Sequence, residues 1–135
     1  MGALVSATDV RPEVAEQVES MGASFVPLPT SQGKSEDGYA KALSTEEAAA
    51  ANALYAEQAA KSDIVITPAS IPGRRAPILL DENAIAGMAP GSIIVDMAAV
   101  NGGNCALTVP GEVVTTDNGV TIIGYLEDGT VLIDA

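Results

Sequence analysis

Short apolar runs alternate with longer polar and helix-forming stretches along this chain. Runs rich in Val, Ile and Leu are typical of strands, and we expect strands over residues 3–9, 24–28, 63–67 and 92–96. The third and fourth runs are continuously apolar, which predicts buried strands. Residues 113–116 and 120–124 flank an Asp-Asn-Gly turn and predict a hairpin. A last short strand is expected over residues 130–133.

Helix signals lie between these runs. The Pro-Glu pair at 12–13 suits a first helical turn, and Gly22 is placed to cap that helix at its end. A Ser-x-x-Glu capping box at 44–47 predicts an alanine-rich helix that runs to about Lys61. Asp81 is placed to cap a short helix over residues 82–88. The polar stretch between the first strand-helix-strand segment and the capping box is expected to be a long loop.

The order of these elements predicts the fold class. Strands that alternate with helices indicate βαβ units, and therefore an α/β fold with a Rossmann-like parallel sheet flanked by helices. A length of 135 residues favours a single domain over residues 1–135. In such sheets ligands bind beyond the carboxyl ends of the strands. Candidate site segments are therefore residues 8–9, 67–72 and 96–104.

Composition excludes several function classes. The net charge is −12, with six basic against eighteen acidic residues, which argues against nucleic acid or an anionic membrane as partner. There is no histidine, so Ser-His and Cys-His mechanisms are excluded and a metal site is not expected. No apolar run approaches 18 residues, no signal peptide is evident, and the single cysteine forms no internal disulfide; we therefore expect a cytoplasmic location.

Asp9 is the first candidate for ligand binding. An acid at the end of a strand in an α/β fold can accept hydrogen bonds from the ribose hydroxyls of NAD, or it can simply be a turn residue before a helix. The glycine fingerprint G-x-G-x-x-G does not occur in the chain. The chain therefore shows no pyrophosphate-binding turn of its own.

Four other features allow both a functional and a structural interpretation. The Arg-Arg pair at 74–75 suits an anion contact or two solvated side chains. Cys105 has no Lys, Arg or His close in sequence that would favour a thiolate, so a small buried residue is the preferred interpretation. Asp96 suits either a ligand contact or a cap for the following loop. Tyr39 suits a lid or an exposed aromatic side chain.

Together these features resemble one family. Six motifs carry the resemblance: A-T-D-V-R-P at 7–12, G-Y-A-K at 38–41, S-D-I-V-I-T with I-P-G-R-R-A-P-I-L over 62–79, M-A-P-G-S-I-I-V-D at 88–96, G-G-N-C-A-L-T-V-P-G-E-V-V at 102–114 and G-V-T-I-I-G-Y at 119–125. The chain resembles the NAD-binding, Rossmann part of the soluble domain of the proton-translocating NAD(P) transhydrogenase alpha subunit. Coverage is about residues 3–125, and residues 126–135 form a divergent tail. Alanine dehydrogenase is a more distant relative.

The resemblance implies NAD(H) as cofactor and hydride transfer from NADH to NADP+ held on another domain, coupled to proton translocation. It implies a homodimer and other transhydrogenase subunits as partners, through which the domain lies peripheral to the inner membrane. Asp9 would bind the adenosine ribose, Tyr39 would belong to a mobile loop over the nucleotide, and residues 67–72 would lie near the nicotinamide. The implied cofactor-binding residues are Asp9, Val10, Arg11, Tyr39, Thr67, Pro68, Ala69, Ser70 and Ile71; no catalytic residue and no metal ligand is implied.

Departures from the family pattern limit this interpretation. The family's first strand and glycine-rich turn would precede Met1, Thr67-Pro68-Ala69-Ser70 stands for T-T-A-L, and Val100 stands for a glutamate. We therefore expect a truncated piece that is inactive alone. Open strand edges and an apolar groove should result, filled by a partner chain or by the strand at 130–133. The alternatives are a non-catalytic oligomerisation or interaction module, and an alanine-dehydrogenase-like oxidoreductase, which the lack of a histidine or a suitably placed lysine disfavours.

Overall fold

A computed structural model describes residues 3–9, 11–28 and 45–126, apart from the side chains of residues 12 and 45–47. The chain forms two compact units, Met1–Leu54 and Tyr55–Ala135, and each is described by itself. The single-domain organisation over residues 1–135 stays a prediction. The predicted capping box and the strand predicted at 130–133 fall wholly or partly outside the described residues.

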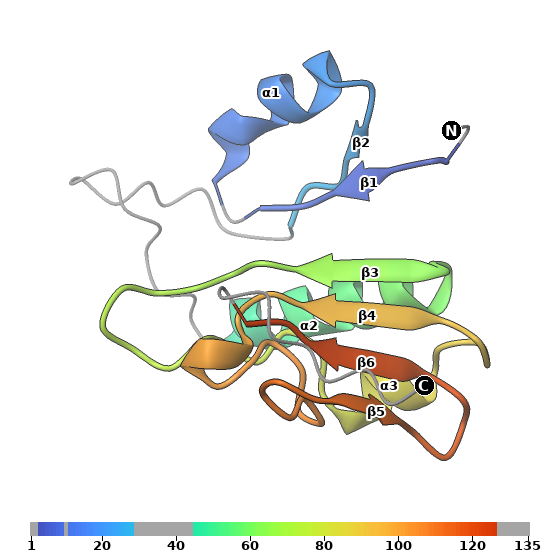
Figure 1. Cartoon of the computed structure of the whole chain (residues 1–135). Coiled ribbons are helices and arrows are strands. Elements are labelled where there is room, and N and C mark those ends of the chain that lie inside the picture. The colour runs from blue at the N-terminus through green and yellow to red at the C-terminus, as the bar shows by residue number, and fades with distance from the viewer. Residues whose placement is uncertain (1–2, 10, 29–44, 127–135) are drawn as a thin grey trace. The chain divides into compact units, whose positions relative to one another are not determined.

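The first unit contains a strand-helix-strand segment (Figure 1). Strands β1 (Ser6–Ala7) and β2 (Ser24–Phe25) pair in parallel. Between them lie a 3-10 turn, η1 (Pro12–Val14), and helix α1 (Ala15–Ser20). Gly22 ends the helix with a φ of 87°, a conformation that glycine adopts without a Cβ clash. The βαβ unit predicted from the sequence is confirmed here, with shorter strands.

The second unit is built on a four-stranded sheet. Its strands are β3 (Ile64–Thr67), β4 (Ile93–Asp96), β5 (Val113–Thr115) and β6 (Thr121–Gly124), in the order β3-β4-β6-β5. β3, β4 and β6 are parallel, and β5 is antiparallel to β6. The predicted hairpin across the Asp-Asn-Gly turn is therefore present.

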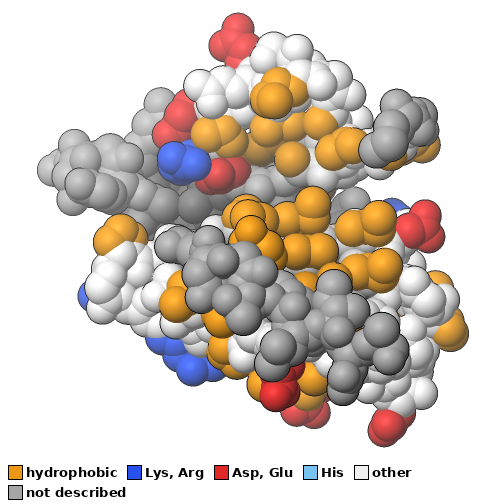
Figure 2. Space-filling model, viewed as in Figure 1, with side chains coloured by type: hydrophobic (Ala, Val, Ile, Leu, Met, Phe, Trp, Pro, Cys, Tyr) orange, Lys and Arg blue, Asp and Glu red, His pale blue; other side chains and the backbone are white. Residues whose placement is uncertain are grey.

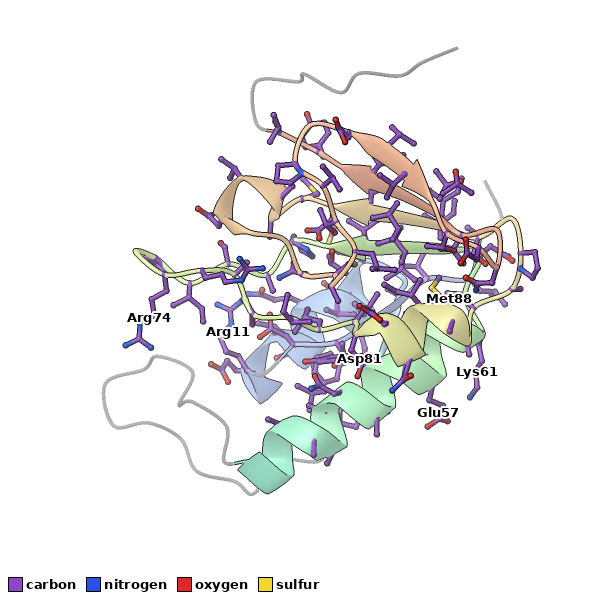
Figure 3. All side chains as sticks on the ribbon, turned by 90° about the horizontal axis from the view of Figure 1, so that it is seen from below. Arg11, Glu57, Lys61, Arg74, Asp81 and Met88 are labelled. Atoms are coloured by element: carbon purple, nitrogen blue, oxygen red, sulfur yellow. The ribbon has the colours of Figure 1, made fainter. Side chains whose placement is uncertain are left out.

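Helices α2 (Thr45–Ala60) and α3 (Glu82–Ala86) lie on the same side of this sheet in both ribbon views (Figures 1 and 3). The Asp81 carboxylate accepts a hydrogen bond of 2.8 Å from the backbone N–H of Ala84 and so caps α3 as predicted. Directly after α2, Lys61 pairs with Glu57 of the helix at 3.2 Å along the exposed surface. A further 3-10 turn, η2 (Ala99–Asn101), follows β4.

The hydrophobic core lies between the sheet and these two helices. Ile94 of β4 and Ile122 of β6 are fully buried and face the helices. Alternate residues of a strand point to opposite faces, so these two side chains define the covered face. The buried cluster consists of Ala59, Leu80, Ala84, Ile85, Met88, Ile94, Cys105, Val120 and Ile122.

The outer strand β3 departs from the sequence prediction. Residues 63–67 were expected to be buried, but Ile64 and Ile66 are 61% and 60% exposed. β3 pairs with β4 alone among the described strands, so it is an edge strand of the sheet. Hydrophobic side chains gather over this region of the second unit (Figure 2). Within the second unit β3 is thus an apolar outer strand, and the open groove and its occupant stay predictions.

No helix in the described ranges is long and apolar enough to cross a membrane.

Candidate functional site

Asp9 and Arg11 form a closed ion pair just beyond β1. The backbone N–H of Arg11 donates to Oδ1 of Asp9 at 2.8 Å, and the side-chain Nε donates to the same oxygen at 3.1 Å. Nη2 of Arg11 donates to Oδ2 at 3.0 Å. The guanidinium therefore donates hydrogen bonds to both oxygens of the carboxylate, which is the bidentate geometry that arginine favours with carboxylates. A spacing of two residues in a tight turn allows this contact.

This contact also lowers the pKa of Asp9. Partial burial acts to raise the pKa of Asp9, but the side-chain and backbone hydrogen bonds and the charge of Arg11 outweigh it, so the pKa lies below its usual value. Asp9 is therefore an acceptor at neutral pH. A carboxylate has about four lone-pair directions, and the three bonds from Arg11 leave one on Oδ2. That oxygen can accept one further hydrogen bond.

Two predicted binding residues lie outside the described residues. Val10 separates Asp9 from Arg11 in the sequence, and Tyr39 lies in the polar stretch that was predicted to be a long loop. Their assignment to the cofactor site stays a prediction.

The other predicted binding segment, residues 67–71, follows β3 in the second unit. Thr67 is buried, Ala69 is half-buried, and Pro68, Ser70 and Ile71 are exposed. The exposed positions present backbone and side-chain polar groups at the carboxyl end of a parallel strand, where ligands of such sheets bind.

Asn104 holds this segment in place. Its side chain is fully buried. Oδ1 accepts from the backbone N–H of Ala69 at 3.1 Å, while Nδ2 donates to the carbonyl oxygens of Ala69 and Pro77, each at 2.8 Å. The Asn104 amide thus holds two positions of the loop after β3, Ala69 and Pro77. Sequence reasoning did not assign Asn104 a role, because its partners are 27 and 35 residues away.

Asp96, at the end of β4, is fully buried and caps the loop that carries Asn104. Its Oδ1 accepts from the N–H of Ala98 at 3.0 Å. Its Oδ2 accepts from the N–H groups of Asn104 and Cys105, at 2.7 and 3.0 Å, and from the hydroxyl of Thr108. Of the two interpretations open from the sequence, the structure supports the loop cap.

The two glycines of the G-G-N-C motif make this arrangement possible. Gly102 and Gly103 have φ values of 104° and 88°, which residues with a Cβ rarely adopt. A Cβ on Gly103 would lie 2.9 Å from Oδ2 of Asp96, and one on Gly102 would lie 2.9 Å from the Arg75 guanidinium. Arg75 donates to the carbonyl of Gly102 at 3.3 Å. Arg75 thus supports the loop, whereas Arg74 projects away from it (Figure 3).

Cys105 lies within this polar cluster and is 1% exposed. Burial and the nearby charge of Asp96 raise the pKa of the Cys105 thiol to about 12, although hydrogen bonds with Thr108 and Thr67 act in the opposite direction. The buried hydroxyl of Thr67 has no hydrogen-bond partner of good geometry among the described residues. The nearby Cys105 thiol is only a weak hydrogen-bonding group. The small buried residue predicted from the sequence is confirmed.

We expect the Cys105 thiol to be inert in the folded protein. Because the folded pKa is raised, the neutral thiol contributes stability below its unfolded pKa of about 8.5, and that contribution is lost as the pH rises towards 12. At pH 8, Ellman's reagent should modify the native chain at least about 100-fold more slowly than the chain in 8 M urea. Comparable rates in both states would contradict the burial of this thiol.

The candidate site residues therefore fall into two groups. Asp9 and Arg11 lie in the first unit, and residues 67–71 with Asn104 and Asp96 lie in the second. Within the described ranges, no group of three or more Cys, Asp or Glu side chains is placed to hold a metal ion.

Comparisons with known proteins agree with this description. The sequence pattern of the family described as "Alanine dehydrogenase/PNT, C-terminal domain" matches residues 1–131. NAD(P) transhydrogenase subunit alpha of Haemophilus influenzae is 54% identical over 128 residues, which is 94% of this chain and 25% of that protein. The subunit alpha of Cereibacter sphaeroides is 51% identical over 130 residues, again 94% of this chain and 25% of that protein. The chain thus spans about a quarter of the length of these curated relatives.

Solved structures show the same relation. The crystal structure of transhydrogenase from Sinorhizobium meliloti superposes with a TM-score of 0.71 at 43% identity, over 93% of this chain and 30% of that one. An L-alanine dehydrogenase superposes with a TM-score of 0.69 at 25% identity, over 96% of this chain and 32% of that one. Both the Rossmann-like α/β fold class and the resemblance to the transhydrogenase alpha subunit are confirmed.

Proposed function

Because this chain belongs to the alanine dehydrogenase/PNT C-terminal domain family, we propose that it binds NAD(H) and contributes to hydride transfer between nicotinamide nucleotides as a section of a larger transhydrogenase. The observation that carries the proposal is the Asp9 carboxylate, which lies just beyond a parallel strand and is oriented by hydrogen bonds from Arg11. The two curated relatives named above are transhydrogenase alpha subunits.

Asp9 would bind the adenosine ribose. Its free acceptor direction on Oδ2 suits a hydroxyl, and hydrogen bonds to a charged acceptor are about twice as strong as those between neutral groups. A rigid carboxylate loses little freedom when it binds, because Arg11 already fixes its orientation. The residues present therefore fit an adenosine ribose.

Residues 67–71 would contact the nicotinamide half. A bound nicotinamide cofactor supplies the transferable hydride, and the protein's role is to position it and to keep water away. Asn104 fixes the backbone of Ala69 with two hydrogen bonds, so exposed groups of this segment are held at defined positions. A fixed loop at a strand end is what such positioning requires. Val10 and Tyr39 complete the proposed set of binding residues.

Partners and location follow as proposals from the same relatives. Those relatives are subunits, so we propose that this chain acts beside other transhydrogenase subunits on the cytoplasmic side of a membrane. We also propose that the chain forms a homodimer. The exposed apolar edge at Ile64 and Ile66 supports an interaction role, and that edge equally favours the second candidate function, a non-catalytic interaction module.

The test is binding of NADH to the purified chain by calorimetry. We expect the Asp9→Ala variant to bind NADH about 10- to 100-fold more weakly than the unchanged chain, since a hydrogen bond to a charged group contributes about 1.5–3 kcal/mol. Asp63→Ala removes the same charge from an exposed position before β3 and should change the affinity little.

Two outcomes would count against the proposal. Equal weakening by Asp9→Ala and Asp63→Ala would show a general effect of charge and no specific contact. Absence of NADH binding to the unchanged chain at millimolar concentration would favour the interaction module.

A further inference from the structure

The sequence contains two Asn-Gly pairs, Asn101–Gly102 and Asn118–Gly119. Asparagine deamidates most readily before glycine, because glycine has no side chain to hinder attack by its own backbone nitrogen. We propose that Asn118–Gly119 is a deamidation site that the fold keeps closed. Unfolding of the second unit opens the site, and the modification then prevents that unit from refolding. This chemistry does not depend on the proposed nucleotide binding.

The reaction needs only the chain and water. The backbone nitrogen of Gly119 loses its proton and forms a bond to the side-chain carbonyl carbon of Asn118. The bond from that carbon to Nδ2 breaks, and ammonia leaves behind a succinimide ring. Water then adds to one of the two ring carbonyl carbons and opens the ring. The product is aspartate or isoaspartate, and no atom is oxidised or reduced.

The folded turn engages both reacting groups. Oδ1 of Asn118 accepts from the hydroxyl of Thr116 at 2.6 Å. The backbone N–H of Gly119, which would have to attack, donates to the carbonyl oxygen of Thr116 at 3.0 Å. Nδ2 of Asn118 donates to three carbonyl oxygens around the end of α3, those of Ile85, Ala86 and Met88, at 3.0, 3.3 and 3.3 Å.

The surroundings of the amide fix its orientation. The three carbonyl oxygens can only accept, so they require the NH₂ group of Asn118 to face them. The hydroxyl of Thr116 accepts from the backbone N–H of Val120 at 3.1 Å and therefore has its own proton to give to Oδ1. Attack by Gly119 requires these bonds to break, so the turn has to open before the reaction begins.

Both products oppose closure of the same turn. An aspartate at position 118 has no N–H group, so its carboxylate would face carbonyl oxygens that have lost their donor. Carbonyl oxygens at the end of a helix carry partial negative charge, which repels a carboxylate. Isoaspartate also adds one atom to the main chain within the tight turn between β5 and β6. Modified chains are therefore trapped in the open state.

Asn101 provides an internal comparison. It is exposed, and its side chain makes no hydrogen bond to any residue that the structure describes. The backbone N–H of Gly102 nevertheless donates to the carbonyl oxygen of Ala99 at 3.0 Å. The attacking nitrogen is thus engaged at both Asn-Gly pairs, and the contacts of the asparagine side chain distinguish them. If any folded backbone gave the same protection, the two sites would react equally slowly.

The experiment follows deamidation at mildly alkaline pH, in buffer and in guanidinium chloride. Cleavage after glutamate places Asn101 in peptide 83–112 and Asn118 in peptide 113–127, and mass spectrometry with fragmentation assigns the modified residue. We expect both sites to react at comparable rates in denaturant. In buffer, Asn118 should react at least about 100-fold more slowly than in denaturant, and more slowly than Asn101.

A second measurement tests refolding. Chains aged in denaturant are returned to buffer and treated briefly with biotin-maleimide, which labels Cys105 only where the second unit stays open, because Cys105 is buried in the fold. Labelled chains are captured and digested. We expect modified peptide 113–127 to be enriched among them at least about 10-fold, the effect of losing the hydrogen bonds of one buried amide. Modification at Asn101 should not be enriched.

Two variants carry the charge change without ageing. Asn118→Asp reproduces one product and should lower the folding equilibrium constant of the second unit at least about 30-fold. Asn101→Asp makes the same change at the exposed pair and should lower it less than about 3-fold. Labelling of Cys105 in increasing urea measures both. If Asn118→Asp does not fold at all, Cys105 labels at the denatured rate in buffer, which agrees with the proposal.

Three results would overturn the proposal. Equal deamidation of Asn118 in buffer and in denaturant would show that the fold does not close the site. Protection of Asn118 no greater than that of Asn101 would show that the side-chain contacts contribute nothing. Burial of Cys105 in chains modified at Asn118, or equal stability of the two aspartate variants, would show that modification does not block refolding.

Discussion

Replacement of Gly124 by alanine is expected to destabilise the second unit strongly. Gly124 ends β6, and its backbone lies against the chain at Val109 and Pro110. An added Cβ would overlap the carbonyl oxygen of Val109 and would lie 3.0 Å from its carbonyl carbon. The two segments cannot separate easily, because Gly124 donates to Glu112 and accepts from Gly111, both at 2.9 Å. Only glycine allows this approach of two backbones.

The expected loss is about 2–4 kcal/mol of unfolding free energy, at the upper end of overpacking effects. Urea unfolding followed by circular dichroism measures it. Gly87→Ala is the matched control, since Gly87 has a φ of −81° and its added Cβ would have no neighbour closer than 3.5 Å; we expect a change below about 1 kcal/mol. Gly91→Ala, with a φ of 90° and open space around it, isolates backbone strain.

A stability of Gly124→Ala within about 0.5 kcal/mol of the unchanged chain, the range of ordinary surface substitutions, would contradict the close approach of β6 to Val109.

Local signals predicted most elements of this fold. The Asp-Asn-Gly turn predicted the β5–β6 hairpin, and Asp81 was placed correctly as the cap of α3. Gly22 ends α1 as expected. These features succeed because the physical cause lies within a few residues of its effect: a turn that needs positive φ, or a side chain that reaches the nearest free N–H.

Burial of β3 could not be predicted in the same way. A continuous run of β-branched residues is typical of a strand covered on both faces, but composition does not reveal how many neighbours the strand has. Ile64 and Ile66 alternate with Val65, which packs against the core, so they lie on the sheet face that α2 and α3 do not cover.

The candidate site was predicted only incompletely. Asp9 was identified from its place after a strand, whereas its partner Arg11 was named only through the family resemblance. Opposite charges two residues apart across a turn were a local signal that pointed to their contact. The role of Asn104 had no such signal, because the amide joins segments that are distant in sequence. Long-range polar contacts of this kind depend on the folded arrangement.

The Asp96 cluster supports a second large effect. Four donors converge on one fully buried carboxylate: three backbone N–H groups and the hydroxyl of Thr108. Each buried donor left without an acceptor costs about 1–3 kcal/mol. Asp96→Ala would leave all four without their partner, and water entering the space would recover some of the loss. We expect a total cost of about 4 kcal/mol, a large fraction of the stability of an ordinary domain.

Asp96→Asn is a milder change, because the asparagine side chain has the same shape as aspartate and keeps one acceptor oxygen. The oxygen can serve the three donors now on Oδ2, at the cost of the Ala98 N–H, so we expect a loss of about 2 kcal/mol. Asp81→Ala, which removes a single capping bond, should cost about 1 kcal/mol. Urea unfolding measures these losses of unfolding free energy and gives their order.

The rate of thiol labelling tests whether the Asp96 cap holds the loop at Cys105. The Asp96 carboxylate holds the Cys105 N–H, so Asp96→Ala should speed labelling of Cys105 in the folded chain, whereas Asp81→Ala should not. Equal labelling in both variants would show that Asp96 does not hold this loop closed.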